Sequence, residues 1–291
     1  MRSTRAIQDV VSGGRTLRAF VSGATDGDVL VFHTGTPSPP VEWKFLDDIA
    51  TQRGLTVVTY CRPGYDGSDR QHGRRVADAA DDVGAILDTL GVNSFATLGW
   101  SGGGQHALAC AAMLPKRCRA AATIGSLSPL PPDDNAWWAE MSPSNAEAFR
   151  AALAGEARLC EHLEPGRQRF LTVSGEELTA TLGDLISATD QEALTPDLAD
   201  MLARSRRQAA ASGFGGWVDD LLAFVGPWGF ELNSIARPVT IWHGREDRFV
   251  PSLHARRIAE EIPCSTPQIL DEEGHLSIAT ARIGEVLDDL T

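Results

Sequence analysis

The chain has 291 residues, of which 43% are hydrophobic and 22% are charged, a composition ordinary for a globular protein with a sizeable core. Its formal net charge of −13 argues against a nucleic acid or an anionic membrane surface as a partner. No stretch reaches transmembrane length, and the N-terminus lacks an apolar run of signal-peptide length.

The five cysteines are odd in number and show no C-x-x-C spacing; they are Cys61, Cys110, Cys118, Cys160 and Cys264. Several fall in apolar surroundings, which indicates reduced thiols used as small hydrophobic side chains. We therefore expect a cytoplasmic protein without disulfides, without a zinc site and without a cofactor.

Strand patterns alternate with helical patterns over the first 125 residues. Buried or paired strands are predicted at residues 7–11, 16–21, 28–33, 55–60, 95–98 and 119–124, the first two joined by a Gly13-Gly14 turn. Helical periodicity covers about 41–52 and 76–90, and an alanine-rich helix follows the strand at 95–98. This alternation is typical of a mostly parallel sheet with helices on both faces.

The sequence Gly99-Trp100-Ser101-Gly102-Gly103 lies between the strand at 95–98 and the alanine-rich helix, and it matches G-x-S-x-G. A serine on a sharp strand-to-helix turn needs small neighbours, because its backbone is strained. Such a turn exposes the hydroxyl at a helix N-terminus, where free amides favour a developing oxyanion. The pattern predicts that Ser101 is a nucleophile; the simpler alternative is a serine that only caps the helix.

The alternation stops between residues 126 and 235, where no buried strand is evident. Helical patterns cover 145–163, 175–189 and 196–211, with prolines and glycines between them. We expect a helical cap of residues 126–235 inserted into a core of 1–125 and 236–291, lying over the strand ends. Aromatic residues are frequent there, and Trp137, Trp138 and Trp217, with Trp100 from the core, are candidates for lining a substrate pocket.

Alternation of strands and helices resumes with strands at 238–243 and 266–270 and helices at 253–261 and from about 277 to 290, which brings the predicted sheet to about eight strands.

A serine hydroxyl needs a base to take its proton, and that base needs an acid to orient it. Asp247 and His275 each follow one of these last two strands, on the same edge of the sheet as Ser101. Serine, acid and histidine thus occur in the order that α/β-hydrolases use.

The chain resembles the α/β-hydrolase superfamily from residue 7 to residue 290. Besides residues 99–103, the resemblance rests on Thr34-Gly35-Thr36-Pro37, on residues 62–68 (Arg-Pro-Gly-Tyr-Asp-Gly-Ser), on Gly244-Arg245-Glu246-Asp247 with Val250-Pro251, and on Gly274-His275. It implies that Ser101 is the nucleophile, Asp247 the acid and His275 the base. It also implies an oxyanion hole formed by the amides of Thr36 and Gly102, with Gly35 as the donor in place of Thr36 if the loop is shifted by one residue.

Two positions depart from the superfamily pattern: Thr34 stands where a histidine is usual, and Asp66 where a second glycine is usual. A serine at position 101 argues against the epoxide hydrolases and dehalogenases of the superfamily, which use an aspartate. Members similar to proline iminopeptidases bind a substrate amine through lid carboxylates. Glu140, Glu147, Glu156 and Glu161 are the candidates, although a solvated helix face is the commoner explanation for such residues.

These observations predict a cofactor-free serine hydrolase, monomeric or homodimeric, that cleaves an ester or related acyl bond of a small, partly apolar molecule. The alternatives on the same triad are an aminopeptidase, a C–C bond hydrolase and an acyltransferase. A non-hydrolytic receptor for a small molecule and a scaffold with a vestigial site also remain open, since one fold serves many functions.

Overall fold

The computed structural model describes residues 6–40, 43–131 and 135–291. Eight strands form one sheet in the order β1-β2-β4-β3-β5-β6-β7-β8. The hairpin β1 (Ala6–Ser12) and β2 (Arg15–Gly23) is antiparallel, and β2 is antiparallel to β4 (Leu55–Tyr60). The remaining pairings are parallel and join β4, β3 (Asp28–His33), β5 (Phe95–Trp100), β6 (Cys118–Ile124), β7 (Val239–Gly244) and β8 (Ser265–Leu270). The predicted eight-stranded, mostly parallel sheet is confirmed.

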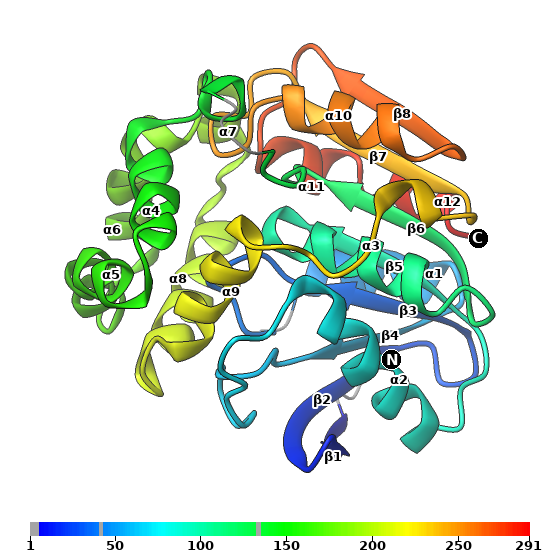
Figure 1. Cartoon of the computed structure of the whole chain (residues 1–291). Helices are drawn as coiled ribbons and strands as arrows, with labels where there is room; N and C mark the ends of the chain where they lie inside the picture. Colours follow the sequence, from blue (N-terminus) through cyan, green and yellow to red (C-terminus); the bar gives the residue numbers. More distant parts are fainter. Residues whose placement is uncertain (1–5, 41–42, 132–134) are drawn as a thin grey trace.

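Helices cover both faces of the sheet (Figure 1). On one face lie α1 (Lys44–Gln52), α11 (Ser277–Ala281) and α12 (Ile283–Asp288), and on the other α2 (Ala79–Thr89), α3 (Gly104–Met113) and α10 (Leu253–Glu261). Strand side chains alternate between the two cores: Leu30 and Phe32 pack into one, and Val31 into the other. Because both faces are buried, the central strands are continuously apolar and not alternately polar.

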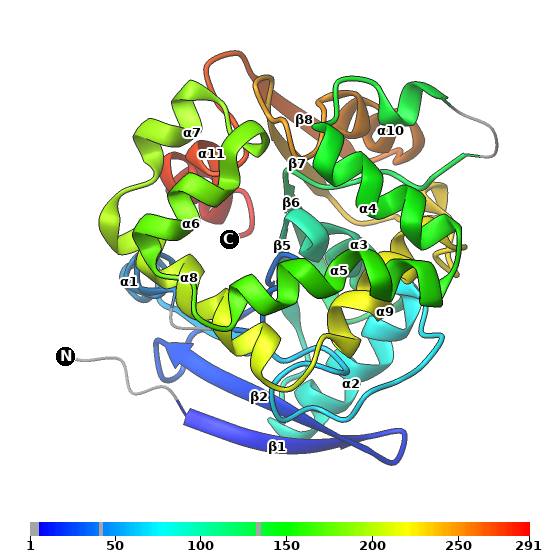
Figure 2. The same cartoon turned by 90° about the vertical axis from the view of Figure 1, so that its left-hand side faces the viewer.

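Helices α4 to α9 connect β6 to β7 and are called the helical segment below. Their bounds are α4 (Pro143–Leu153), α5 (Glu156–Phe170), α6 (Gly175–Leu182), α7 (Ala188–Ala193), α8 (Pro196–Ala211) and α9 (Gly215–Val225). Figure 2 views the molecule from the side on which they lie and shows them around the ends of β5, β6 and β7. In parallel sheets, ligands bind at this edge, beyond the carboxyl ends of the strands.

Several predicted helices are divided in the structure. The helix predicted at 145–163 is two helices, α4 and α5, because Gly155 between them has a left-handed φ of 108° that a continuing helix does not accommodate. The helix predicted at 175–189 is likewise α6 and α7, with a short 3₁₀ turn, Gly183–Leu185, between them. The helix predicted from about 277 to 290 is also divided, into α11 and α12. The start of the helix predicted at 41–52 falls on residues 41–42, outside the described residues.

Candidate active site

Ser101 lies at a sharp turn between β5 and α3, with a left-handed φ of 55°. Close backbone contacts explain the glycines on either side of it. A Cβ on Gly99 would lie 2.3 Å from the carbonyl oxygen of Gly103, and one on Gly103 would lie 2.1 Å from that of His33. The strained backbone at Ser101 is therefore held by packing that only glycine permits at these two positions.

His275 and Asp247 are in direct contact, although 28 residues separate them in the chain. The Nδ1 of His275 lies 2.7 Å from Oδ2 of Asp247, and both residues are buried. The other carboxylate oxygen, Oδ1, accepts a hydrogen bond of 2.8 Å from the Val250 amide. The His275 ring packs against both Trp100 and Phe249, with centroid distances of 5.5 and 4.6 Å. These contacts fix the ring orientation and the tautomer with its proton on Nδ1, so that Nε2 is left to accept a proton.

The helical segment holds the backbone next to His275. Asp190 of α7 accepts hydrogen bonds from the amides of His275 (3.0 Å), Leu276 (2.7 Å) and Ser277 (3.0 Å). Its side chain is fully buried against Gly274, where a Cβ would lie 2.4 Å from Oδ1. A carboxylate that accepts several backbone N–H bonds makes short, strong contacts, so Asp190 fixes the position of the His275 loop.

The Thr34–Pro37 loop lies against the Ser101 turn. A Cβ on Gly102 would lie 2.5 Å from Oγ1 of Thr36, and one on Gly35 would lie 3.3 Å from Cβ of Ser101. Both Gly35 and Thr36 are thus close to Ser101. Arg62 holds this loop, because its guanidinium donates hydrogen bonds to the carbonyl oxygens of Thr34 (2.7 Å) and Gly35 (2.9 Å).

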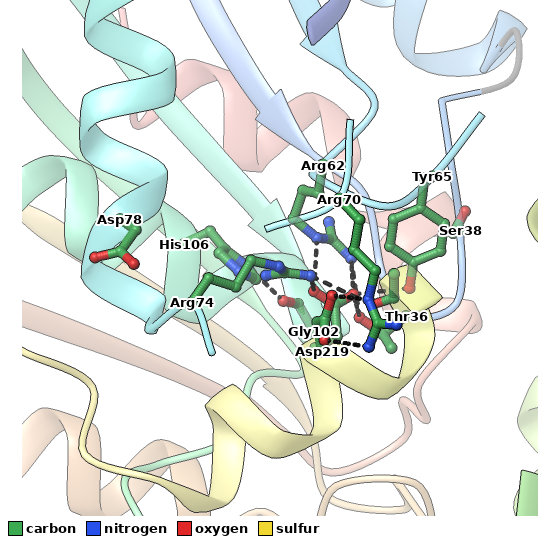
Figure 3. Close-up of polar contacts among 12 residues, drawn as sticks. Thr36, Ser38, Arg62, Tyr65, Arg70, Arg74, Asp78, Gly102, His106 and Asp219 are labelled. Carbon is green, nitrogen blue, oxygen red and sulfur yellow. Dashed lines mark hydrogen bonds and ion pairs between the residues drawn. The ribbon is translucent and has the colours of Figure 1, made fainter. Parts of the chain in front are cut away.

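A buried charge cluster joins this loop to the helical segment. Asp220 of α9 accepts hydrogen bonds from Arg62 (2.6 Å), Arg74 (2.5 Å), Tyr65 (2.8 Å) and the Thr36 hydroxyl (2.6 Å). Figure 3 shows Arg62 and Arg74 reaching toward α9, together with Arg70, which pairs with Asp219. Although burial acts in the opposite direction, Arg62 and Arg74 hold the pKa of Asp220 well below its usual range. The cluster therefore stays charged at neutral pH, with two arginines sharing one carboxylate.

Two further histidines, His33 and His106, are buried and are neutral at physiological pH. Burial and the nearby Arg62 lower the pKa of His33 to about 3 and that of His106 well below its usual value. Nδ1 of His106 lies 2.9 Å from the carbonyl oxygen of Gly102 and, as the donor, fixes the peptide that follows Gly102. Neither ring lines the cavities beside Ser101 in the described part of the chain.

A cavity of about 500 Å³ lies between Ser101 and the helical segment. Its walls are mainly apolar, and they include Leu163, Phe170, Leu182, Trp217, Phe224 and Phe249. A second, small cavity of about 30 Å³ borders Ser101, His275, Thr36 and Trp100. Ser101, His275 and Thr36 thus border one small space, and Asp247 contacts the histidine.

The candidate pocket tryptophans fall into two groups. Trp217 lines the larger cavity and Trp100 the smaller one. Trp137 and Trp138 line neither cavity in the described part of the chain; Trp137 is buried against Phe149 and donates its indole N–H to the carbonyl oxygen of Ser128. Sequence alone could not separate the groups, because an aromatic side chain packs equally well into a core or against a cavity.

Among the four glutamates considered for amine binding, only Glu147 lines the larger cavity in the residues that the structure describes. Glu156 pairs with Arg70 at 2.9 Å and Glu161 with Arg158 at 3.2 Å, both on the surface. Among these four glutamates, the structure therefore places no pair of carboxylates at the cavity for a substrate amine.

A family model described as alpha/beta hydrolase fold matches residues 28–281. The chain belongs to the alpha/beta hydrolase family. An uncharacterized hydrolase of Bacillus subtilis (strain 168), YcgS, is 24% identical over 289 residues, which cover 94% of this chain and 92% of the relative.

Solved structures agree on the fold of this alpha/beta hydrolase. A hydrolase from Pseudomonas aeruginosa PA01 has a TM-score of 0.71 at 21% identity, covering 100% of this chain and 99% of that one. The enol-lactonase from Burkholderia xenovorans LB400 has a TM-score of 0.70 at 19% identity, covering 97% and 99%. At these identities the likeness shows the fold and not the substrate.

Sequence reasoning missed three residues that shape the site of this alpha/beta hydrolase: Asp190, Asp220 and Arg206, all in the helical segment. Each contacts a residue at least 85 positions away, so no local spacing reveals it. Within residues 6–40, 43–131 and 135–291, no group of three or more His, Cys, Asp or Glu side chains is arranged to hold a metal ion. No helix in those ranges is long and apolar enough to cross a membrane.

Proposed function

We propose that this alpha/beta hydrolase cleaves an ester or lactone of a small molecule, with Ser101 as nucleophile, His275 as base and Asp247 as the acid that orients it. The observation that carries the proposal is the 2.7 Å contact between His275 Nδ1 and Asp247, made beside a cavity that both His275 and Ser101 border. A binding protein needs no such arrangement of acid and base next to a strained serine.

In the proposed reaction, Nε2 of His275 accepts the Ser101 proton while Oγ attacks the acyl carbonyl. The amides of Gly102 and Thr36 bind the oxyanion, with Gly35 as the alternative to Thr36. His275 then returns the proton to the departing alkoxide, and water hydrolyses the acyl-enzyme by the same steps in reverse order. In a lactone the alkoxide remains attached to the acyl group, so one product results.

The cavity supports a substrate of modest size. About 500 Å³ falls within the range of sites for small molecules, and the mainly apolar walls suit a partly apolar acyl group. We propose that the helical segment acts as a cap that closes this cavity from solvent. The similarity to a solved enol-lactonase is consistent with a lactone, and the larger cavity accommodates an open-chain ester equally well.

The test is labelling with a fluorophosphonate, together with hydrolysis of p-nitrophenyl esters of increasing chain length. Wild type should be labelled and should turn over the shorter esters, and Ser101→Ala should do neither while keeping the wild-type melting temperature. Ser144→Ala, which removes another hydroxyl that borders the larger cavity, is the control and should still be labelled. A folded wild type that is neither labelled nor active would favour the small-molecule receptor instead.

A further inference from the structure

Arg206 of α8 carries a positive charge to the candidate active site. The residue is half-buried and borders both cavities, the larger one under the helical segment and the small one shared by Ser101, His275 and Thr36. Burial lowers the pKa of Arg206 to about 10, which leaves the guanidinium protonated at neutral pH.

No carboxylate neutralises this cation in the described part of the chain. The one hydrogen bond of Arg206 there goes to the carbonyl oxygen of Pro37, and the guanidinium lies 5.8 Å from the centre of the Phe170 ring. A guanidinium has five N–H donors, so most of its hydrogen-bonding capacity is unused. A half-buried cation that borders a cavity and has no carboxylate partner points to a ligand that supplies the opposite charge.

The charges around Arg206 also favour an anionic ligand. Arg62 and Arg74, buried beneath the same loop, are paired with Asp220, and two positive charges already share that single carboxylate. Glu147, the acidic residue that borders the larger cavity, is exposed and forms no ion pair with Arg206 among the described residues. In a chain of net charge −13, the space beside Ser101 is thus locally positive.

We propose that Arg206 binds a carboxylate of the substrate, so that the enzyme prefers esters or lactones whose acyl part carries one negative charge. This inference rests on the proposed function. The planar guanidinium suits a planar carboxylate, and Arg206 borders both cavities, whereas the exposed Arg169 borders only the larger one. Because Arg206 borders the small cavity together with Ser101, a carboxylate bound to it would lie close to the reacting carbonyl.

The experiment compares two methyl esters of similar shape, monomethyl succinate and methyl 4-methylpentanoate, in which an isopropyl group replaces the carboxylate. The measured quantity is the ratio of their kcat/KM values, because a general loss of activity cancels in it. We expect Arg206→Gln to lower the ratio of anionic to neutral ester by about 30-fold, the effect of one charge-assisted hydrogen-bonded pair. Arg206→Lys keeps the charge but not the planar fork, and it should lower the ratio less.

Arg204→Gln is the matched control, because Arg204 is exposed on the same helix. It removes the same charge and should leave the ratio unchanged. A change of less than about threefold in both Arg206 variants would overturn the proposal and would leave Arg206 as a structural link to Pro37. If Arg206→Gln does not fold, the lysine variant decides the question alone.

A binding measurement separates this inference from the proposed function. Monomethyl succinate should raise the melting temperature of Ser101→Ala, and should not do so for Ser101→Ala combined with Arg206→Gln. If neither ester is hydrolysed but this shift depends on Arg206, the hydrolase proposal fails and the carboxylate site stands. If both esters are hydrolysed equally well and the shift does not depend on Arg206, the carboxylate site fails and the hydrolase proposal stands.

Discussion

Asp190 belongs to the helical segment, but three of its hydrogen bonds end on the backbone at and after His275. Replacing it with asparagine keeps the size of the side chain and leaves one acceptor oxygen, with an amide NH₂ facing backbone N–H groups. Because the variant alters the position of His275 and not the cavity, kcat should fall by about 10- to 100-fold while KM changes little. The free energy of unfolding should fall by about 2 kcal/mol.

Steady-state kinetics and urea unfolding of Asp190→Asn test this, with Glu192→Gln as the control. Glu192 is exposed on the same short helix, and its substitution should change stability by less than about 0.5 kcal/mol. If Asp190→Asn is destabilised but keeps the wild-type kcat, the carboxylate serves the fold alone.

Local signatures predicted where Ser101, Asp247 and His275 lie, and they did not predict contacts made across the fold. Ser101 lies in a five-residue pattern that its own backbone requires, and Asp247 and His275 follow strands whose apolar runs are visible in the sequence. Asp190 lies in the sequence Ala-Thr-Asp-Gln, which is typical of an ordinary helix start. Its role depends on the docking of α7 against residues 275–277, which no local pattern encodes.

At the scale of elements, α9 is tied to the Thr34–Pro37 loop through Asp220. The side chains of Asp220, Arg62 and Arg74 are 0, 3 and 3% exposed, so the pairs are removed from solvent. Removing one member of a buried ion pair leaves the other without a counter-charge. We therefore expect Asp220→Asn to lower the free energy of unfolding by about 3–5 kcal/mol, measured by urea denaturation.

The neighbouring Asp219→Asn provides the matched control. Asp219 is also buried, but its partner Arg70 is 30% exposed and keeps Glu156 as a second partner, so no buried charge is left alone and the loss should be smaller, about 1–2 kcal/mol. Equal losses in the two variants would contradict the view that the buried cluster, and not α9 packing in general, anchors the loop.

The helical segment was the least predictable part of the fold. The sequence at the start of α9, Gly213-Phe214-Gly215-Gly216, is unfavourable for a helix, and no side chain caps this end. The helix exists because its buried residues, among them Val218, Leu221 and Phe224, pack against the core and because Asp220 meets two arginines. Both causes are contacts between segments that are distant in the sequence. The sheet, in contrast, follows from runs of apolar residues that any register of a parallel sheet would bury.

For the whole molecule, buried histidines link stability to pH. Burial lowers the pKa of His33, His106 and His243 from the ordinary value near 6.5, and that of His33 to about 3. Each is neutral in the folded chain and gains a proton on unfolding when the pH is below 6.5. Their contribution to stability is therefore complete above pH 6.5 and is lost as the pH falls toward the folded pKa values. Asp82, whose pKa burial raises, acts in the opposite direction.

The free energy of unfolding should therefore decrease between pH 6.5 and 5, by up to about 1.4 kcal/mol per pH unit for each of these histidines. Asp220 adds nothing in this window, since its contribution is lost only below the unfolded aspartate pKa near 3.9.

Urea unfolding at several pH values measures the slope. His106→Phe should reduce the slope, even if the variant is less stable at pH 7.5, because one of these proton uptakes is removed. His72→Gln alters an exposed histidine and should leave the slope unchanged. A flat profile from pH 6.5 to 5 in wild type would mean that the buried rings acquire protons without unfolding.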